Sequence, residues 1–266
     1  MADKIIDFHT HAFSDELAPK AMKALVEHHP EIPYFLDGTI FSLLKSMDAV
    51  GIEKSVICSI ATKPKQFQPI LDWSLQIQSY RIIPLASVHP ADPDRDEHIK
   101  QIKQSGLKGI KMHPFYQDFY LDEDLMFGFY EQVCKNDLLL VMHTGYDIAF
   151  EHIDRAGPVR IVNVMKKFPQ LKLITTHFGA WQDWDEVESE IIGKNIYMEI
   201  SFALDYLEPA KAKKLFESHP ADYILFGTDS PWRDQQKTLN LLKKLNLDPE
   251  RMQKILYQNA EKLLSR

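Results

Sequence analysis

The spacing of histidines is the first sign of chemistry in this chain. His9 and His11 are two residues apart, so on a β-strand their imidazoles would project to the same side. Two neighbouring imidazoles can bind one divalent metal ion at about 2.0–2.1 Å. If His143 and Asp229 also reached that ion, three nitrogens and one carboxylate oxygen would suit zinc, although iron, manganese or cobalt would also bind. A catalytic site of this kind keeps one position open for water.

The elements that must position these side chains follow from the apolar pattern. Eight short apolar or β-branched runs predict strands at residues 4–9, 55–60, 82–89, 108–113, 138–143, 171–177, 195–201 and 223–229. Several are nearly continuous apolar runs, as expected for parallel strands covered by helices. One His-x-His pair is a weak signal. The set is stronger, because five of these runs end in a histidine and the last ends in an aspartate: His9, His89, His113, His143, His177 and Asp229.

Longer amphipathic segments with helix-end signals lie between these runs. Thr39 can cap a helix that Gly51 ends. Asp94 and Glu97 have capping-box spacing. Pro158 suits the first turn of a further helix. The chain therefore alternates strands and helices, which predicts parallel βα units.

Eight such units in 266 residues predict one domain, an α/β fold of the (β/α)₈ (TIM) barrel type spanning residues 1–266. An open doubly wound sheet is less favoured, because residues 9–13, which follow the first strand, lack the glycines of a phosphate loop. In a barrel all strand ends meet at one face, which would bring the histidines and Asp229 together. The two longest loops, residues 12–38 and 143–157, should lie at the same face and contact the substrate.

Composition and charge narrow the class of partner. The chain is 45% hydrophobic and 26% charged, with a formal net charge of −7. This acidic balance argues against nucleic acid or an anionic membrane as the partner. No segment approaches the roughly 20 apolar residues that span a bilayer, and Cys58 and Cys134 fit reduced thiols. We expect a cytoplasmic protein that acts on a small molecule.

Several motifs together resemble one family. Residues 5–11 (IIDFHTH) resemble the opening of the amidohydrolase superfamily. Later segments occur in the order of its amidohydrolase-2 branch, which includes aminocarboxymuconate-semialdehyde decarboxylases: 109–114 (GIKMHP), 143–145 (HTG), 176–179 (THFG), 227–232 (GTDSPW) and 257–263 (YQNAEKL). The resemblance covers nearly the whole chain.

The resemblance implies a role for each matching position. It implies one divalent metal ion, which we expect to be zinc, bound by His9, His11, His143 and Asp229. It implies that His177 lies beside the water at this metal rather than being a main ligand. In binuclear relatives a carboxylated lysine or a glutamate at strand four bridges two ions. Because Lys111 is at strand four in this sequence, a second metal ion remains an alternative. The resemblance also leaves a homodimer open.

Four further residues are candidates for substrate contact. Lys111 and His113 would face the substrate at strand four, with an ion pair between Lys111 and Glu199 as the structural alternative. Trp232 and Arg233 follow Asp229 and would line the mouth, where an arginine could meet a substrate carboxylate. Solvent exposure is the alternative for both.

These parts suit two reactions. A divalent metal makes water acidic enough to supply hydroxide near neutral pH. Asp229 could take up and return a proton, and His177 could stabilise developing negative charge. This favours hydrolysis of an amide, lactone or ester. Decarboxylation of an unsaturated or aromatic acid is the alternative, although the decarboxylases of the branch are longer chains. A metal-stabilised barrel without catalysis is a third hypothesis.

Overall fold

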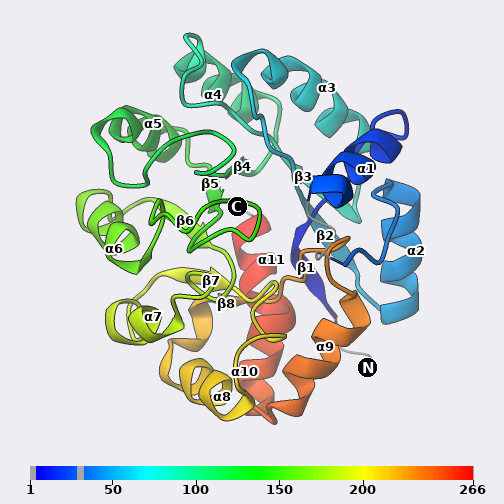
Figure 1. Cartoon of the computed structure of the whole chain (residues 1–266), viewed down its shortest axis with the longest axis vertical. Coiled ribbons are helices and arrows are strands. Elements are labelled where there is room, and N and C mark those ends of the chain that lie inside the picture. Colours follow the sequence, from blue (N-terminus) through cyan, green and yellow to red (C-terminus); the bar gives the residue numbers. More distant parts are fainter. Residues whose placement is uncertain (1–3, 29–32, 266) are drawn as a thin grey trace.

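Eight parallel strands lie inside a ring of helices in the computed structural model, which describes residues 4–28 and 33–265 (Figure 1). All eight predicted strands are present, each displaced or shortened by a few residues. They are β1 (Ile6–Thr10), β2 (Lys54–Cys58), β3 (Ile82–Leu85), β4 (Gly109–Met112), β5 (Leu139–Met142), β6 (Lys172–Thr175), β7 (Tyr197–Glu199) and β8 (Ile224–Leu225). The predicted (β/α)₈ barrel in one domain is therefore confirmed.

The strands close on themselves in sequence order. Regular pairing joins β1 to β3 through β2, and β4 to β8 in order. At one junction the amide of Lys111 donates to the carbonyl of Ala86 at 2.8 Å. At the other, the amide of Phe8 donates to the carbonyl of Phe226 at 2.8 Å. The ring leaves no long unpaired strand edge, and it directs all carboxyl ends of the strands to one mouth.

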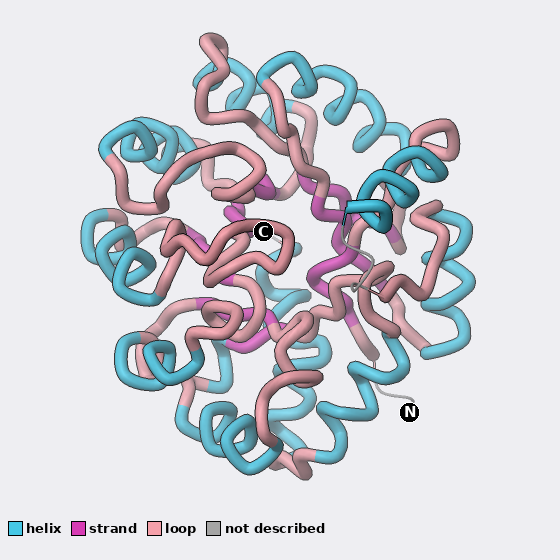
Figure 2. Tube along the Cα trace, in the orientation of Figure 1, coloured by secondary structure: helices cyan, strands magenta, loops and turns pink. Residues whose placement is uncertain are grey.

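The helices form the outer ring, and loops cover the mouth (Figure 2). The helices are α1 (Ala18–His28), α2 (Ile40–Val50), α3 (Phe67–Ile77), α4 (Arg95–Gln104), α5 (Asp124–Lys135), α6 (Pro158–Lys167), α7 (Trp184–Glu190), α8 (Pro209–Ser218), α9 (Gln235–Lys244), α10 (Pro249–Gln253) and α11 (Asn259–Leu264). None of the helices in the described part of the chain is long and apolar enough to cross a membrane.

The helix-end signals were read correctly in two of three cases. The Thr39 hydroxyl accepts a hydrogen bond from the amide of Ser42, and Gly51 ends α2 with φ 82°. Pro158 occupies the first turn of α6. The predicted capping box of α4 is wrong. Asp94 has φ −98° and ψ 15° instead of an extended conformation, so its side chain makes no capping hydrogen bond.

Two layers of apolar side chains hold the barrel. An inner cluster fills the ring with alternate residues of the strands, and α11 packs against it through Ala260, Leu263 and Leu264. A larger cluster lies between the strands and the outer helices. The helix α11 crosses the centre of the ring in Figure 1. The inner cluster therefore closes one end of the barrel, and the mouth is left for polar side chains.

The loops at the mouth partly match the prediction. The segment predicted as a long loop after the first strand contains the helix α1. Its first residues, Ala12, Phe13, Ser14 and Leu17, still line the cavity at the mouth. The segment after β5 is an irregular loop, as expected, and it also lines the cavity.

Candidate metal centre

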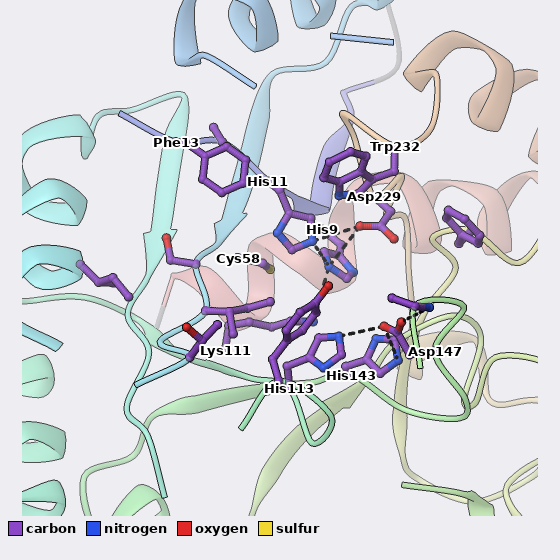
Figure 3. Close-up of a pocket in the computed structure, with 18 of the residues that line it drawn as sticks. His9, His11, Phe13, Cys58, Lys111, His113, His143, Asp147, Asp229 and Trp232 are labelled. Carbon is purple, nitrogen blue, oxygen red and sulfur yellow. Dashed lines mark hydrogen bonds and ion pairs between the residues drawn. The ribbon is translucent and has the colours of Figure 1, made fainter. Parts of the chain in front are cut away.

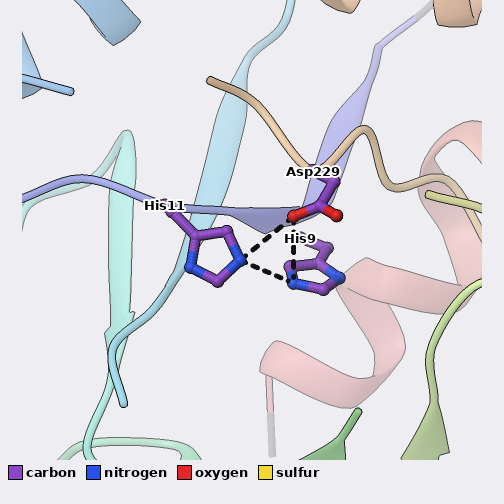
Figure 4. A group of neighbouring side chains, drawn as sticks. All are labelled: His9, His11 and Asp229. Carbon is purple, nitrogen blue, oxygen red and sulfur yellow. Dashed lines mark hydrogen bonds and ion pairs between the residues drawn. The ribbon is translucent and has the colours of Figure 1, made fainter. Parts of the chain in front are cut away.

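Three side chains converge at the end of β1 (Figure 4). The Nε2 atoms of His9 and His11 lie 3.1 Å apart, and Asp229 Oδ1 lies 3.1 Å from the Nε2 of His11 and 3.7 Å from that of His9. The register of β1 against β2 shifts between Asp7 and Thr10, at the residues that present the histidines. Two nitrogens and one carboxylate oxygen this close together can hold a divalent metal ion.

Asp229 reaches this position through an uncommon backbone conformation. Its φ is 65°, and its amide donates to the carbonyl of His9 at 2.8 Å. His177, at the end of β6, also has a positive φ, of 57°. Such conformations cost free energy and cluster at functional sites. Burial raises the pKa of Asp229, but the imidazoles of His9 and His11 outweigh it and hold that pKa well below its usual value.

The far side of the His9 ring is anchored. His9 Nδ1 lies 2.9 Å from Oε1 of Glu199, which is fully buried at the end of β7. Burial, together with the positive charge of Lys111, lowers the pKa of His9 to about 4. His9 is therefore neutral at pH 7. With Nδ1 as the donor to Glu199, the Nε2 lone pair faces His11 and Asp229, as a metal ligand requires.

The fourth expected ligand, His143, lies in a second group of side chains (Figure 3). Its ring stacks on that of His113 with centroids 4.0 Å apart. Asp147 Oδ2 lies 3.1 Å from the Nε2 of His113 and 3.6 Å from the Nε2 of His143. These three residues form a second set that could hold a metal ion.

The two groups are joined through His177. The Nδ1 of His143 lies 3.1 Å from the Nε2 of His177, and the ring centroids of His177 and His9 are 5.8 Å apart. Ser201 Oγ lies 3.1 Å from the Nδ1 atoms of both His9 and His177. The structure thus brings His9, His11 and Asp229 into direct contact and leaves His143 one ring away. The Nδ1 of His143 faces His177, and its Nε2 lies 3.0 Å from the carbonyl of Tyr146.

Lys111 lies beneath the first group. It is 1% exposed, and its Nζ is 3.5 Å from the Nε2 of His9. Burial lowers the pKa of Lys111, while the nearby Glu199 and Asp229 oppose that effect. Lys111, His113 and Trp232 all line the cavity, and their contact with a substrate stays a prediction.

Arg233 does not line the cavity, which differs from the prediction. Its Nε is 3.3 Å from Asp205 Oδ2, and its Nη2 donates to the Tyr206 hydroxyl at 2.6 Å. The guanidinium also lies over the Phe202 ring at 3.5 Å. Because a 5% exposed arginine must have its charge compensated, these partners fix it behind the wall of the site. It is therefore a support of the loop after β7 rather than a ligand for a substrate carboxylate.

The cavity at the mouth has a volume of about 510 Å³ and contains both groups. Its other walls come from the end of β2, from α3 and from the loops after β1, β4, β5, β6, β7 and β8. Aromatic side chains recur around it: Phe13, Trp73, Tyr116, Tyr146, Trp181, Phe202 and Trp232. The volume and the mainly apolar lining suit a small molecule.

The sequence reasoning missed two acidic residues of this site. Asp147, four residues after His143, contacts two histidines, and Glu199 contacts His9. Glu199 had been considered only as a partner of Lys111. A signal existed for each, because Glu199 lies near the end of the seventh strand run and Asp147 in a long mouth loop. An acid at such a position contacts a histidine of another strand only in the closed barrel.

Comparisons with known proteins show the family of this chain. The model of the amidohydrolase family matches residues 6–266, so the chain belongs to the amidohydrolase family and is an enzyme. No curated protein matches the chain by sequence.

Solved structures show the same fold at low identity. An uncharacterized TIM-barrel protein of Bordetella bronchiseptica has a TM-score of 0.79 and 21% identity, with 98% of each chain covered. A 5-carboxyvanillate decarboxylase of Novosphingobium aromaticivorans with bound manganese has a TM-score of 0.72 and 15% identity, covering 100% of this chain and 98% of that one. A probable 2-pyrone-4,6-dicarboxylic acid hydrolase of Acinetobacter baumannii has a TM-score of 0.68 and 16% identity, covering 98% and 99%.

Proposed function

We propose that this enzyme is a metal-dependent hydrolase that cleaves an amide, lactone or ester bond in a small molecule. The observation that carries the proposal is the convergence of His9, His11 and Asp229 at one end of a cavity of about 510 Å³. One divalent ion, which we propose to be zinc, would be held by these three side chains, with His143 as the fourth ligand through its Nδ1. An ion in this position supplies a Lewis acid for a carbonyl oxygen and acidifies water.

The residues fit such an ion. Burial lowers the pKa of His9 and His143, so both imidazoles are neutral and offer lone pairs at pH 7. Asp229 supplies a negative charge in a buried site, which a cation would balance. Manganese is bound in the Novosphingobium decarboxylase and is therefore the competitor of zinc. The three imidazole ligands proposed here favour zinc, because manganese prefers oxygen ligands.

The chain's own groups would handle protons and negative charge. Asp229 is placed to accept a proton from water at the His9–His11 end of the cavity and to return it to a leaving group. His177 lines the same cavity, with its Nε2 3.1 Å from His143 Nδ1, and it would donate to an oxygen that gains negative charge. Lys111, 3.5 Å from His9, would hold a substrate oxygen from below.

Decarboxylation of an unsaturated or aromatic acid is the second candidate. The mainly apolar cavity favours it, because a carboxylate loses CO₂ more readily when water is excluded from around it. The Novosphingobium decarboxylase has a TM-score of 0.72, and the Acinetobacter hydrolase has one of 0.68.

Metal content per chain is the first test. We expect about one zinc or manganese ion per chain by mass spectrometry, and its loss in His9→Ala and in Asp229→Ala. His219→Ala is the matched control, since His219 is also buried and its Nε2 donates to the carbonyl of Ile196, outside the cavity. Retention of metal by both site variants would contradict the proposed centre. Two ions per chain would instead indicate that the second group, with His113 and Asp147, is also occupied.

The products then separate the two reactions. A hydrolase incorporates oxygen from ¹⁸O-labelled water into its product, whereas a decarboxylase releases CO₂ and incorporates none. A panel of lactones, amides, esters and aromatic acids should be screened with the metal-loaded chain. Release of CO₂ without label would replace hydrolysis by the second candidate.

A further inference from the structure

Charged side chains are confined to one part of the cavity. Among the described residues that line it, Lys111 is the only lysine or arginine, and Asp147 and Asp229 are the only acids. Lys111 is buried beside His9, at the metal end of the cavity. The cavity thus has a polar end, formed by the strand-end residues, that would receive one polar group of a substrate.

The wall supplied by α3 and the segment before it is uncharged. Gln66, Ile70 and Trp73 have the i, i+4, i+7 spacing of one helix face and line the cavity. Ile60, from the connection after β2, and Leu17, before α1, extend the apolar surface. In the ring, β2 lies across from β5 and β6, which present His143 and His177 (Figure 1).

A second anionic group on the substrate would find no partner in this wall. Lys111 cannot pair with this second group, because the Nζ of Lys111 lies at the other end of the cavity, near His9. Arg233, the nearby arginine in sequence, is committed to Asp205 outside the lining. Burying a carboxylate against apolar side chains without a cation is costly.

We propose that the enzyme acts on substrates with one polar head group and an uncharged apolar tail, and that Ile70 and Trp73 of α3 select the tail. The inference rests on the proposed function in one respect, the position of the head group. The carbonyl or carboxylate of the head must bind at the end of the cavity formed by His9 and Asp229. The dicarboxylic acid in the name of the Acinetobacter hydrolase is outside this class.

Two benzoates that differ only at the tail test this selection. 4-Isopropylbenzoate and terephthalate share the head and the ring, and the isopropyl group has the branching of the second carboxylate. Binding is measured by quenching of tryptophan fluorescence, since Trp73, Trp181 and Trp232 line the cavity. We expect 4-isopropylbenzoate to bind at least about tenfold more tightly, from the cost of burying an unpaired charge.

An engineered cation should reverse the preference. Ile70→Arg places a guanidinium in the tail wall, where it can pair with the distal carboxylate of terephthalate, and we expect the ratio to shift by about tenfold or more toward terephthalate. Leu75→Arg is the matched control, because Leu75 is on the same helix but is 41% exposed and outside the lining. Circular dichroism and thermal melting establish that both variants fold.

Both ligands are measured with metal-loaded and chelator-treated protein, which separates the two proposals. If the chain binds no metal but still prefers the isopropyl compound, the proposed function fails and the tail selection stands. Equal or tighter binding of terephthalate by the unchanged chain overturns the selection, as does an unchanged ratio in folded Ile70→Arg. Absence of saturable binding of 4-isopropylbenzoate in both forms also overturns it.

Discussion

Glu199 Oε1 lies 2.9 Å from Nδ1 of His9, and both side chains are almost completely buried. The same carboxylate accepts hydrogen bonds from the amides of His177 and Ser201. One acid at the end of β7 therefore fixes the ring of a candidate metal ligand on β1 and the backbone of a candidate proton donor after β6. The adjoining Gly227 has room for no side chain, because an added Cβ would overlap Glu199 Oε2.

Glu199→Gln should weaken metal binding. The amide can keep one accepted hydrogen bond but not the charge that orients His9, and loss of such a partner costs about 10–100-fold in metal affinity. Affinity is measured by competition with a coloured chelator. Glu97→Gln, at an exposed position of α4, is the control and should leave affinity unchanged. Equal affinities in the two variants would show that Glu199 does not orient the ligand.

Asp147→Asn tests the other acid in the site. Asp147 holds the stacked rings of His113 and His143 from the loop after β5. We expect metal affinity to fall about tenfold, because His143 loses the group that orients its Nε2 side. Glu151→Gln, exposed on the same loop, should have no effect. If Asp147→Asn binds metal normally, His143 is either not a ligand or is oriented by the Tyr146 carbonyl alone.

Gly145→Ala should destabilise the fold more than Gly51→Ala. Both glycines have nearly the same left-handed φ, 83° and 82°, so the backbone strain of the change is matched. An added Cβ at Gly145 would overlap the backbone of Trp181, whereas at Gly51 it meets nothing within 4 Å. We expect a loss of about 1 kcal/mol for Gly51→Ala and about 3 kcal/mol or more for Gly145→Ala. Urea unfolding measures both, and equal losses would show that the loop after β5 can shift.

His219 should make stability depend on pH. Burial lowers its pKa to about 4, and its Nε2 donates to the carbonyl of Ile196 at 3.0 Å. Because the unfolded chain takes up this proton near pH 6.5, the folded state loses stability as pH falls from 6.5 to 4 and keeps it in full above 6.5. We expect the loss between pH 7 and 4.5 to be about 2 kcal/mol smaller in His219→Gln, measured by urea unfolding at both values. An identical loss in the two proteins would mean that His219 is protonated in the folded state.

The apolar pattern of the sequence predicts the barrel and most of its polar end. Continuous apolar runs alternating with amphipathic segments determine the eight strands, because both patterns depend only on which face each element buries. Residues at strand ends converge in any closed parallel barrel, so the meeting of His9, His11 and Asp229 followed from their positions alone.

Only the tertiary structure decided which neighbours these residues have. Asp147 contacts His113 across 34 residues of sequence, and Glu199 contacts His9 across 190 residues, and no local pattern encodes either pairing. Arg233 lies outside the cavity lining, where Asp205 balances its buried charge. The sequence also does not show that the apolar face of α3 lines the cavity. The inner side of a helix is apolar whether it covers the barrel or a ligand, and only the packed chain shows which it does.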